Sequence, residues 1–559
     1  MRKRATEYFE ELEKLNLNEE FRCVNALQQT PWAINKRVLA VLRQAWDSGQ
    51  EWGGLPPRDD LPLPPYPFDV EPSELTEEQM KDFKLFRKRR GEVHQHNNRT
   101  MSLRILIERT LQMAEEYSER DEFYYVWQLD FRGRKYPMES FMSPQTGDAG
   151  KALLTFAYGV PIKNSEDAKW LAIHGANVYG NDKISLEDRE MFAYMNTDMA
   201  KAVSADPYSN TEWLEADKPW QFLAWCFEWA DYMEVVERGM GEQFITYLPC
   251  HADGTCNGLQ HLSAILRDEV GGKSVNLLPS DIPMDIYADV AVAAMDRIRL
   301  DTMDSGNLLA HRALQYGIDR KMTKRSVMIV PYSGTRFACR DYVVEAIDER
   351  TKKTGLDFWG DDKYKAANYI SNHIWEAIND KISSARTVMD YIRSIGDLYA
   401  KNQIVMQWTT PTGFLVWQSY SDMYKRRIKT AINGSIVKLN YMGQVENSVS
   451  RSKTLSGSSP NFIHSMDAAA LTMTVNRCVD AGIRDFAMVH DSYGTHSTNM
   501  NAMSHFLREA FVELYDSNDV LKQLYDHAVK MLPNEDIPLP PTRGNLNIKD
   551  VLESEYFFS

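Results

Sequence analysis

Two aspartates, each placed directly after a short apolar run, are the residues of this sequence best suited to do chemistry. Asp253 follows the run that starts at Ile245, and Gly254 comes next. Asp491 follows the apolar residues 486–489. A carboxylate at the end of a strand, beside a glycine turn, can face a metal ion together with a backbone carbonyl. Two such units could share a pair of divalent cations, the usual device for in-line displacement at phosphorus.

Magnesium is the metal that this pattern favours, with two ions expected, because carboxylates, carbonyls and phosphate oxygens are hard ligands. An Asp-Gly pair taken alone is more often a simple turn. The metal hypothesis therefore depends on Asp253 and Asp491, which are far apart in the sequence, meeting in space.

A basic segment, residues 319–332, could hold the phosphates of a substrate. Arg320 and Lys324 stand four positions apart, so they share one face of a helix. Paired cations on a helix can bind a triphosphate and stabilise the pyrophosphate that leaves. Pro331 disfavours helix at the residue before it, which places Tyr332 just beyond the helix end. The alternative is an ordinary basic surface helix with a buried tyrosine.

A second arrangement of cations suits a nucleic-acid backbone. Residues 126–136 read as a strand that ends in a turn, where Gly133 separates Arg132 from Arg134. Glycine allows a phosphate to approach, and each guanidinium can hold it through two hydrogen bonds. Lys151, beside Gly150, offers a further cation.

The charge balance argues against nucleic acid only when it is taken as a sum. The formal net charge is −15, from 64 basic and 79 acidic residues. Phosphate contacts need local basic surfaces, however, and three are present, at residues 81–104, 320–325 and 425–429. Any one of them alone could be a solvated helix face.

Length and composition indicate a soluble protein of roughly two to four domains. Apolar residues make up 43% of the 559 residues and charged residues 26%, and the six cysteines form no CxxC pair. Neither a zinc site nor a disulfide framework is therefore expected. We find no signal peptide and no apolar run that could span a bilayer, so we expect a cytoplasmic location and no membrane partner.

Periodicity predicts a largely helical chain with a few strands. Helices are expected within residues 1–50, 74–118, 164–229, 280–300 and 342–400, with a proline-rich connector at 55–72. Strands are expected at 405–408, 414–417, 436–442 and 444–449, with Met442-Gly443 as a hairpin turn. Residues 490–494 read as a tight turn, and residues 459–467 lead into an alanine-rich helix.

Taken together, these stretches resemble the single-subunit RNA polymerases of bacteriophages and mitochondria, most closely the phage branch. Residues 253–261 look like motif A of that family, 320–332 like motif B and 490–492 like motif C. Residues 130–136 are similar to its Asp-x-Arg-Gly-Arg element, and 460–465 to its Pro-Asn-Phe-Val-His stretch. The resemblance extends from about Ala33 to the last residue.

The resemblance implies an α+β, mostly helical, right-hand polymerase fold of palm, fingers and thumb, with a small antiparallel palm sheet. It divides the chain into a helical lead (1–32), a thumb-like helical region (33–120), the first part of the palm (121–165), a helical palm insertion (166–244), palm motif A (245–270), fingers (271–464, with a hairpin at 436–459), and palm motif C with the C-terminal tail (465–559).

The resemblance also implies a role for each candidate residue. Asp253 and Asp491 would bind the two Mg²⁺ ions, assisted by the Gly254 carbonyl. The nucleotide would be contacted by Arg320, Lys324, Tyr332, His464, Tyr287 and Gly258, of which Lys324 and Tyr332 would also belong to the catalytic set. DNA template and RNA product would be contacted by Arg132, Arg134, Lys151, Glu446 and Ser448.

Two departures from the family pattern concern the choice of start site. The loop between Gly443 and Pro460, which contains Glu446 and Ser448, is shorter than usual. We expect no counterpart in this chain of the N-terminal domain that melts promoter DNA in that family. We therefore expect initiation to need a separate N-terminal subunit or a single-strand-binding activator, unless the shortened hairpin opens DNA itself or the sequence is truncated.

Two rival functions remain, a related DNA polymerase and a nucleic-acid-binding subunit without catalysis. DNA-making relatives carry a bulky glutamate at the sixth position of motif A, where this chain has Gly258, which leaves room for a 2′-hydroxyl. They also carry glutamate where motif C here has Ser492. A nucleic-acid-binding subunit without catalysis would not need to retain Asp253 and Asp491. RNA synthesis from nucleoside triphosphates is the interpretation that these residues favour.

Overall fold

The computed structural model describes residues 2–303, 306–432 and 435–559. It is mostly helical, and its strands form small antiparallel sheets, so the predicted α+β class is confirmed. All six cysteines are free. Within the described ranges, every helix is too short or too polar to cross a membrane.

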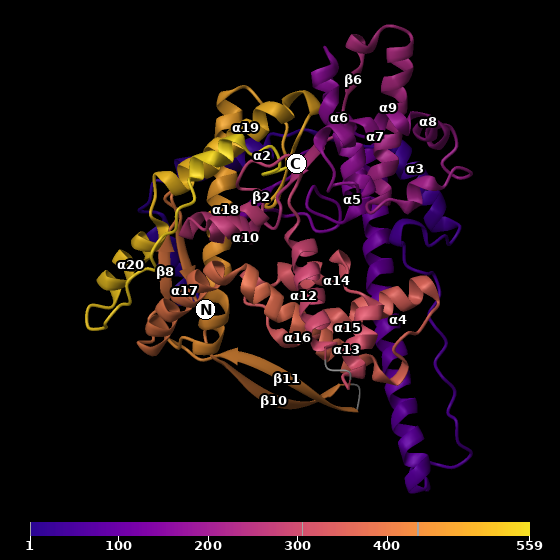
Figure 1. The fold of residues 1–559 in the computed structure, drawn as a ribbon, viewed down its shortest axis with the longest axis vertical. Coiled ribbons are helices and arrows are strands. Elements are labelled where there is room, and N and C mark those ends of the chain that lie inside the picture. The colour runs from indigo at the N-terminus through magenta and orange to yellow at the C-terminus, as the bar shows by residue number, and fades with distance from the viewer. Residues whose placement is uncertain (1, 304–305, 433–434) are drawn as a thin grey trace.

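Helices make up most of the first half of the chain (Figure 1). They are α1 (Arg2–Leu12), α2 (Asn18–Gln28), α3 (Lys36–Asp47), α4 (Glu77–Ser118), α5 (Asp148–Ala152), α6 (Ser165–Tyr179), α7 (Leu186–Met195), α8 (Thr197–Ala205), α9 (Pro219–Glu237), α10 (Asn257–Leu266) and α11 (Glu269–Ser274). The predicted helices at 1–50, 74–118 and 164–229 are thus confirmed, apart from short interruptions.

The second half contains α12 (Ile286–Asp301), α13 (Leu308–Tyr316), α14 (Arg320–Met328), α15 (Arg336–Thr354), α16 (Lys363–Lys381), α17 (Ser383–Lys401), α18 (Arg451–Asp480), α19 (Met500–Asp516) and α20 (Val520–Met531). The strands are β1 (Trp32–Ile34), β2 (Trp127–Leu129), β3 (Lys135–Pro137), β4 (Leu154–Phe156), β5 (Val160–Pro161), β6 (Ile245–Thr246), β7 (Cys250–Asp253), β8 (Met406–Thr409), β9 (Leu415–Gln418), β10 (Met423–Ile432), β11 (Ser435–Gln444), β12 (Ala487–Val489) and β13 (Ser492–Thr495).

A three-stranded antiparallel sheet with the order β12-β13-β7 brings distant parts of the chain together. Ser492 on β13 pairs with Asp253 on β7. The turn predicted over residues 490–494 is therefore wrong in extent, because only His490 and Asp491 form it. The residues after Asp491 are extended because they pair with β12 on one side and β7 on the other.

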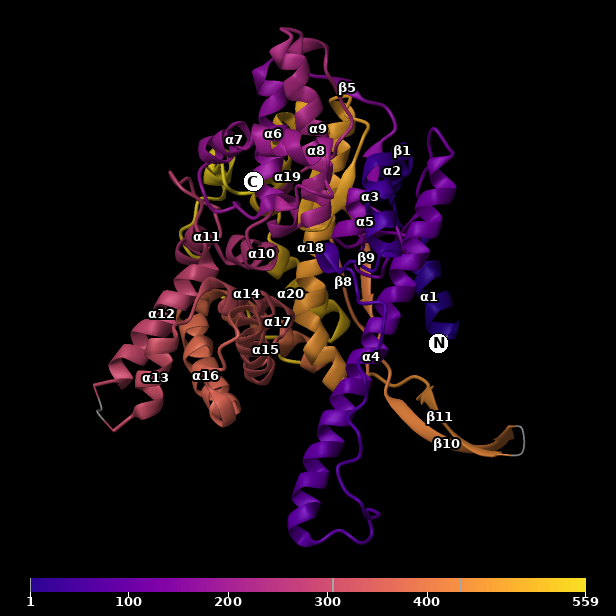
Figure 2. The ribbon, with the colours of Figure 1, turned by 90° about the vertical axis from the view of Figure 1, so that its right-hand side faces the viewer.

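Helix α18 runs through the centre of the molecule and is buried along most of its length (Figure 2). It contains Pro460 within its 30 residues and carries His464 and Asp467. It packs against α2, α17 and α19, so it joins the beginning and the end of the chain. Burial of polar and apolar residues around most of the helix explains why its sequence shows no amphipathic period.

Helix α4 projects far from the body of the molecule, accompanied by the connector at 55–72 (Figures 1 and 2). Its 42 residues begin at a capping box in which Thr76 and Gln79 satisfy each other's backbone N–H groups. Most of its residues are exposed, so this basic helix is a solvated arm over much of its length.

A long hairpin, β10–β11, differs from the hairpin that the sequence predicted at 436–459. It spans Met423–Gln444, with Ile432 paired to Ser435 and residues 433–434 lying outside the described ranges. Met442 and Gly443 are strand residues rather than a turn, and residues 451–459 belong to α18. The sequence places Asn433-Gly434 between the strands, and Asn-Gly is the strongest two-residue hairpin signal.

Candidate active site

The two predicted catalytic aspartates meet at one edge of the small sheet. Asp253 ends β7, and Asp491 occupies the turn between β12 and β13, next to the partner of Asp253 in the sheet register. The Gly254 N–H donates a hydrogen bond to the backbone carbonyl of Asp491 at 2.9 Å. The hypothesis that these carboxylates converge, although 238 positions separate them in the sequence, is confirmed.

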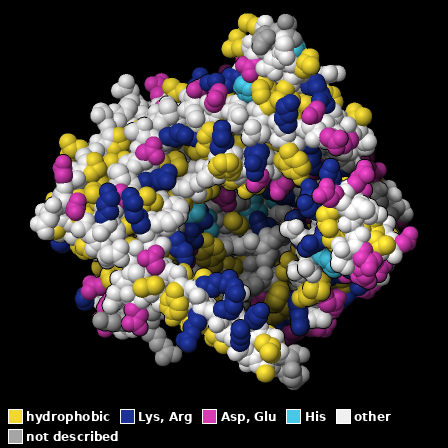
Figure 3. Space-filling view, turned by 90° about the horizontal axis from the view of Figure 1, so that it is seen from below, with side chains coloured by type: hydrophobic (Ala, Val, Ile, Leu, Met, Phe, Trp, Pro, Cys, Tyr) yellow, Lys and Arg dark blue, Asp and Glu magenta, His cyan; other side chains and the backbone are white. Residues whose placement is uncertain are grey.

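Both carboxylates line a cavity of about 280 Å³. Seen from below, the molecule has a central hollow (Figure 3). Dark blue basic side chains surround this hollow in that view. The cavity is lined by Lys151, Asn177, Gly180, Asp182, Lys183, Asp217, Lys218, Asp253, Gly254, Thr255, Cys256, Tyr287, Arg320, Lys324, Met328, Val489, Asp491, Ser492 and Ser559. Seven of the predicted site residues are absent from this lining, and their positions are given below: Gly258, Tyr332, His464, Arg132, Arg134, Glu446 and Ser448.

Lys218 is a site residue that the sequence analysis missed. It immediately precedes Pro219 at the start of α9, and its Nζ lies 3.3 Å from Oδ2 of Asp253. Burial alone would raise the pKa of the Asp253 carboxyl, but the Lys218 ammonium and a hydrogen bond from Ser492 hold that pKa below its usual range. A lone lysine before a proline carries no sequence signal for such a role.

Asp491 is electrostatically different from Asp253. Burial and the negative charge of Asp253 raise the pKa of the Asp491 carboxyl. A cation between two like charges would relieve this repulsion. Among the described residues, no group of three or more His, Cys, Asp or Glu side chains is placed to hold a metal. Two carboxylates with open positions for water and phosphate oxygens nevertheless fit the way Mg²⁺ is usually bound.

Helix α14 presents its predicted cationic face to the same cavity. Arg320 and Lys324 both line it, whereas Lys321 and Arg325 form ion pairs with acidic residues of α15. Burial, together with the nearby Arg320, lowers the pKa of the Lys324 ammonium. Burial likewise lowers the pKa of Lys151, which also lines the cavity.

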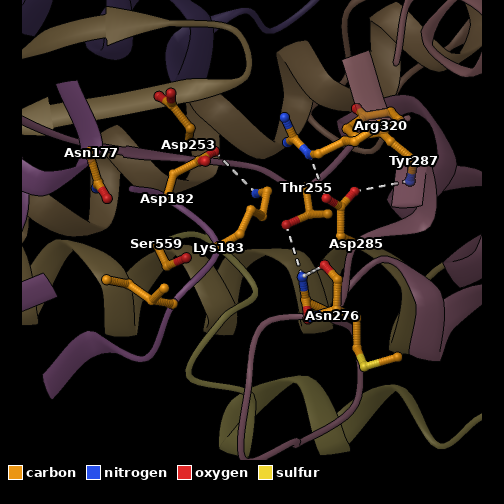
Figure 4. Close-up of polar contacts among 12 residues, drawn as sticks. Asn177, Asp182, Lys183, Asp253, Thr255, Asn276, Asp285, Tyr287, Arg320 and Ser559 are labelled. Carbon is orange, nitrogen blue, oxygen red and sulfur yellow. Dashed lines mark hydrogen bonds and ion pairs between the residues drawn. The ribbon is translucent and has the colours of Figure 1, made fainter. Parts of the chain in front are cut away.

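Arg320 is held in place by residues at the start of α12. Its Nε donates to the Asp285 carboxylate, and its guanidinium lies over the Tyr287 ring, 5.4 Å from the centroid. Asp285 also caps α12 by accepting the N–H of Tyr287 at 3.0 Å. Figure 4 shows these three side chains together on one side of the view, with Asp182 and Asp253 on the other. Tyr287 thus lies in the cavity wall, and its contact with the nucleotide remains a prediction.

Tyr332 follows the end of α14, in a 3-10 turn formed by Val330–Tyr332, as the proline predicted. A Cβ added to Gly258 would lie 2.9 Å from the Pro331 Cβ and 3.3 Å from the Tyr332 hydroxyl oxygen. Gly258 therefore permits a close approach between α10 and this turn. The Tyr332 ring packs on the His464 ring, with centroids 4.8 Å apart.

Arg132 and Arg134 extend from the β2–β3 turn, but each already has a partner inside the protein. Arg132 is bound by the Asp130 carboxylate and contacts His464. Arg134 forms an ion pair with the buried Asp467 on α18. Burial raises the pKa of Asp467 to about 6, although Arg134 acts in the opposite direction. These contacts fasten the turn to α18.

Glu446 and Ser448 lie between β11 and α18, outside the cavity lining. The Ser448 hydroxyl accepts the Asp422 N–H at 2.9 Å and donates to the Val445 carbonyl at 2.9 Å. This serine therefore closes the base of the β10–β11 hairpin. Their predicted contact with DNA remains a prediction.

The last residues of the chain form part of the site, which the sequence analysis did not foresee. The Ser559 N–H donates to the Asp253 carbonyl at 3.2 Å, and the Asp253 N–H donates to the Ser559 carbonyl at 3.4 Å. Phe557 and Phe558 are buried beside this strand-like pair, and Phe558 packs edge-on against Tyr493. The aromatic end thus acts as an extra edge for β7.

Comparison with known proteins agrees with this geometry. A family model described as DNA-dependent RNA polymerase matches residues 163–539. The chain belongs to this family. It is 33% identical to the DNA-directed RNA polymerase of Enterobacteria phage T3, over 98% of this chain and 65% of the relative. The T7 RNA polymerase of Escherichia phage T7 is 32% identical, with 98% of this chain and 65% of the relative covered.

An organellar relative is similarly close. The mitochondrial DNA-directed RNA polymerase 1 of Nicotiana sylvestris is 33% identical over 100% of this chain and 54% of the relative. The chain therefore spans less than two thirds of the length of these relatives. Among solved structures, the polymerase domain of Pol1 from M. smegmatis aligns with a TM-score of 0.39 at 11% identity, covering 89% of this chain and 66% of that one.

Proposed function

We propose that the chain is the catalytic part of a DNA-directed RNA polymerase that adds ribonucleotides from NTPs to an RNA 3′-OH on a DNA template. One observation supports this proposal most: Asp253 and Asp491 share a cavity with Arg320 and Lys324. Carboxylates that can hold divalent cations thus face cations that can hold a triphosphate. Nucleotidyl transfer needs both kinds of group at once.

The residues around the aspartates fit a magnesium site. Asp253, Asp491 and the Gly254 carbonyl would hold two Mg²⁺ ions, while Lys218 keeps Asp253 ionised in their absence. When bound, the ions would supply charge stabilisation for the attacking and leaving oxygens. Family membership supports divalent-metal use in general. The choice of Mg²⁺ and of these ligands is part of the proposal.

Lys324, Lys151 and Arg320 form the proposed triphosphate site. Burial lowers the pKa values of Lys324 and Lys151, so their ammonium groups are costly to keep charged in the free protein. A polyphosphate would supply counter-charge, so its binding would be favoured and the leaving pyrophosphate stabilised. Asp285 and Tyr287 orient Arg320 for the same purpose.

The absence of a side chain at Gly258 would admit a ribonucleotide. A larger side chain there would press on Pro331 and crowd the Tyr332 hydroxyl. We therefore assign Tyr332 and His464 to the side of the pocket that faces the sugar. The rival DNA polymerase would need bulk at this position, which this site does not accommodate without movement of the turn.

The nucleic acid is proposed to run along the hollow shown in Figure 3. Helix α4 and the β10–β11 hairpin, which carry the basic segments 81–104 and 425–429, extend from the body of the molecule (Figure 1). Glu446 and Ser448 lie at the base of the hairpin. They would influence DNA binding by fixing the orientation of the hairpin. Arg132 and Arg134 would act near the product through the β2–β3 turn that they hold to α18.

Extension of a primed RNA–DNA hybrid tests the proposal. The purified chain with Mg²⁺ and four ribonucleotides should extend the primer, whereas Asp253→Asn and Asp491→Asn should abolish extension and leave hybrid affinity nearly unchanged. Asp526→Asn, at an exposed ion pair with Lys522, is the matched control and should behave as wild type. Losing a metal ligand should cost several kcal/mol of barrier.

The same assay separates the rival functions. Extension with deoxyribonucleotides but not ribonucleotides would identify a DNA polymerase. Tight hybrid binding without extension by the wild-type chain would favour a binding subunit. Near-normal extension by either aspartate variant would remove that residue from the active site.

A further inference from the structure

The imidazole of His464 is held by an arginine in a way that fixes its protonation. Nη1 of Arg132 lies 2.8 Å from Nδ1 of His464. A guanidinium carries only N–H donors and stays charged, so Nδ1 must be the acceptor and carries no proton. The neutral ring then bears its single proton on Nε2.

Arg132 has little freedom to release this contact. Oδ2 of Asp130 accepts hydrogen bonds from Nε at 2.9 Å and from Nη2 at 2.5 Å. Oδ1 of Asp130 accepts the backbone N–H of Arg132 at 2.8 Å and that of Arg134 at 3.2 Å. A fork-shaped pair of this kind fixes both the position and the orientation of the guanidinium. The carboxylate, the arginine and the turn thus form one rigid unit.

The surroundings disfavour a second proton on the ring. Burial, together with Arg134 and Arg132, lowers the pKa of His464 to about 2. The titratable and charged groups that face it from neighbouring elements are Arg132 and Arg134 of the β2–β3 turn, His261 of α10, Tyr332 of the 3-10 turn, and His490 of the β12–β13 turn. None of them supplies a negative charge that would stabilise an imidazolium.

The other nitrogen of the ring is available to a ligand. In the described part of the chain, no residue is hydrogen-bonded to Nε2 of His464, and this residue is only partly buried. One face of the ring packs on Tyr332, whose hydroxyl lies next to Gly258. A fixed N–H donor therefore lies beside the position assigned to the sugar.

We propose that Asp130 and Arg132 are positioning residues that lock His464 in the Nε2–H form, so that its ring offers one donor to the 2′-hydroxyl oxygen of the nucleotide. This inference rests on the proposed function. It goes beyond that function because it assigns to the β2–β3 turn a part in sugar selection. It also requires the preference for ribose to be independent of pH across the working range, since the donor neither titrates nor moves to Nδ1.

Nuclear magnetic resonance of the full chain tests the protonation state without any substrate. With ¹⁵N-labelled histidine, long-range ¹H–¹⁵N spectra of the wild type should show His464 as the Nε2–H form, without titration between pH 5.5 and 8.5. His464→Gln assigns the signal. In Arg132→Met, the signal should move toward a mixture of both forms, with a pKa closer to the ordinary value of about 6.5.

Kinetics give the second readout. The ratio of kcat/KM for a ribonucleotide to that for its deoxy counterpart should be flat with pH in the wild type. In Arg132→Met it should fall about tenfold, which is the effect of one lost hydrogen bond, and should become dependent on pH. Arg132→Lys, which retains a donor but not the fork, should fall between the two.

The outcomes separate the two levels of inference. A wild-type His464 protonated on Nδ1, or an Arg132→Met variant with unchanged spectra and an unchanged ratio, would overturn the proposal. If His464 has the Nε2–H form but the chain makes no RNA, the positioning of His464 by Arg132 would stand and the proposed function would be refuted. If Arg132→Met fails to fold by circular dichroism, the wild-type spectrum and Arg132→Lys still decide the protonation state.

Discussion

Gly258 is the position where one added carbon should disturb catalysis without removing any functional group. In Gly258→Ala, the new Cβ would lie 2.9 Å from Cβ and 3.2 Å from Cγ of Pro331. Carbon atoms do not approach so closely, and the proline ring belongs to a tight turn rather than to a flexible side chain. The turn must therefore shift, and Tyr332 must shift with it.

The size of the effect follows from the cost of overpacking. Inserting a methyl group into a well-packed site costs about 1–3 kcal/mol. If the displaced turn must return to its place for each nucleotide addition, kcat/KM for a ribonucleotide should fall by about 5- to 150-fold. Affinity for the RNA–DNA hybrid should stay nearly the same, because Gly258 is buried within α10.

Single-turnover extension and hybrid titration measure the two quantities. Gly91→Ala is the matched control, since a Cβ there meets no atom within 4 Å and lies in the exposed helix α4. This control should leave kcat/KM unchanged. It should raise the free energy of unfolding by about 1 kcal/mol, because alanine has the higher helix propensity. A folded Gly258→Ala variant with wild-type kcat/KM would refute the argument that this contact positions Tyr332.

Four further outcomes are expected. Tyr332→Phe should keep polymerisation but weaken rejection of deoxynucleotides, because an unpaired polar group no longer penalises the missing 2′-hydroxyl; an unchanged ratio of the two kcat/KM values would place selectivity elsewhere. Lys135→Met should lower the free energy of unfolding by about 3–5 kcal/mol. In the wild type, Nζ of Lys135 lies 2.6 Å from Oε2 of the buried Glu20, and the substitution leaves this carboxylate without its ion-pair partner. Urea unfolding should show this loss, and the added change Glu20→Gln should restore part of it. Burial lowers the pKa of His261 to about 3, so the unfolded chain binds more protons between about pH 6.5 and pH 3 and stability should fall as the pH drops through that window; His261→Gln should flatten this slope, and an unaltered slope would contradict the assignment. Finally, the chain alone should start RNA on a pre-melted bubble and on single-stranded DNA but not on a closed duplex promoter, because unstacking costs a few kcal/mol per step; efficient site-specific starts on the closed duplex would exclude the need for a partner.

The sequence predicted the site better than it predicted the strands around it. Asp253 and Asp491 could be recognised because each follows an apolar run and carries a matching motif. Arg320 and Lys324 could be placed on one face because helical spacing is a local property. Such features are encoded within a few residues, so reading them requires no knowledge of tertiary contacts.

The features that sequence reasoning missed depend on long-range packing. Lys218 meets Asp253 only because α9 begins next to β7 in space. Ser559 pairs with Asp253 through a contact between the chain end and the sheet, which no local pattern encodes. The hairpin was misplaced for a different reason. Its turn signal lies at residues 433–434, but the strands flanking it carry basic and apolar residues in no strict alternation.

The β10–β11 hairpin also has a consequence for how the protein behaves in solution. It pairs with no other strand of the described structure, so both of its outer edges expose backbone N–H and C=O groups. Ile428, Leu439 and Tyr441 are 42%, 48% and 53% exposed, which adds apolar surface to these edges. Exposed edges of this kind promote strand-to-strand aggregation unless charged side chains oppose it. Lys425, Arg426, Arg427 and Lys429 provide that opposition, and salt weakens it. Concentrated stocks should therefore aggregate more readily at high ionic strength, in spite of the large net charge of the chain.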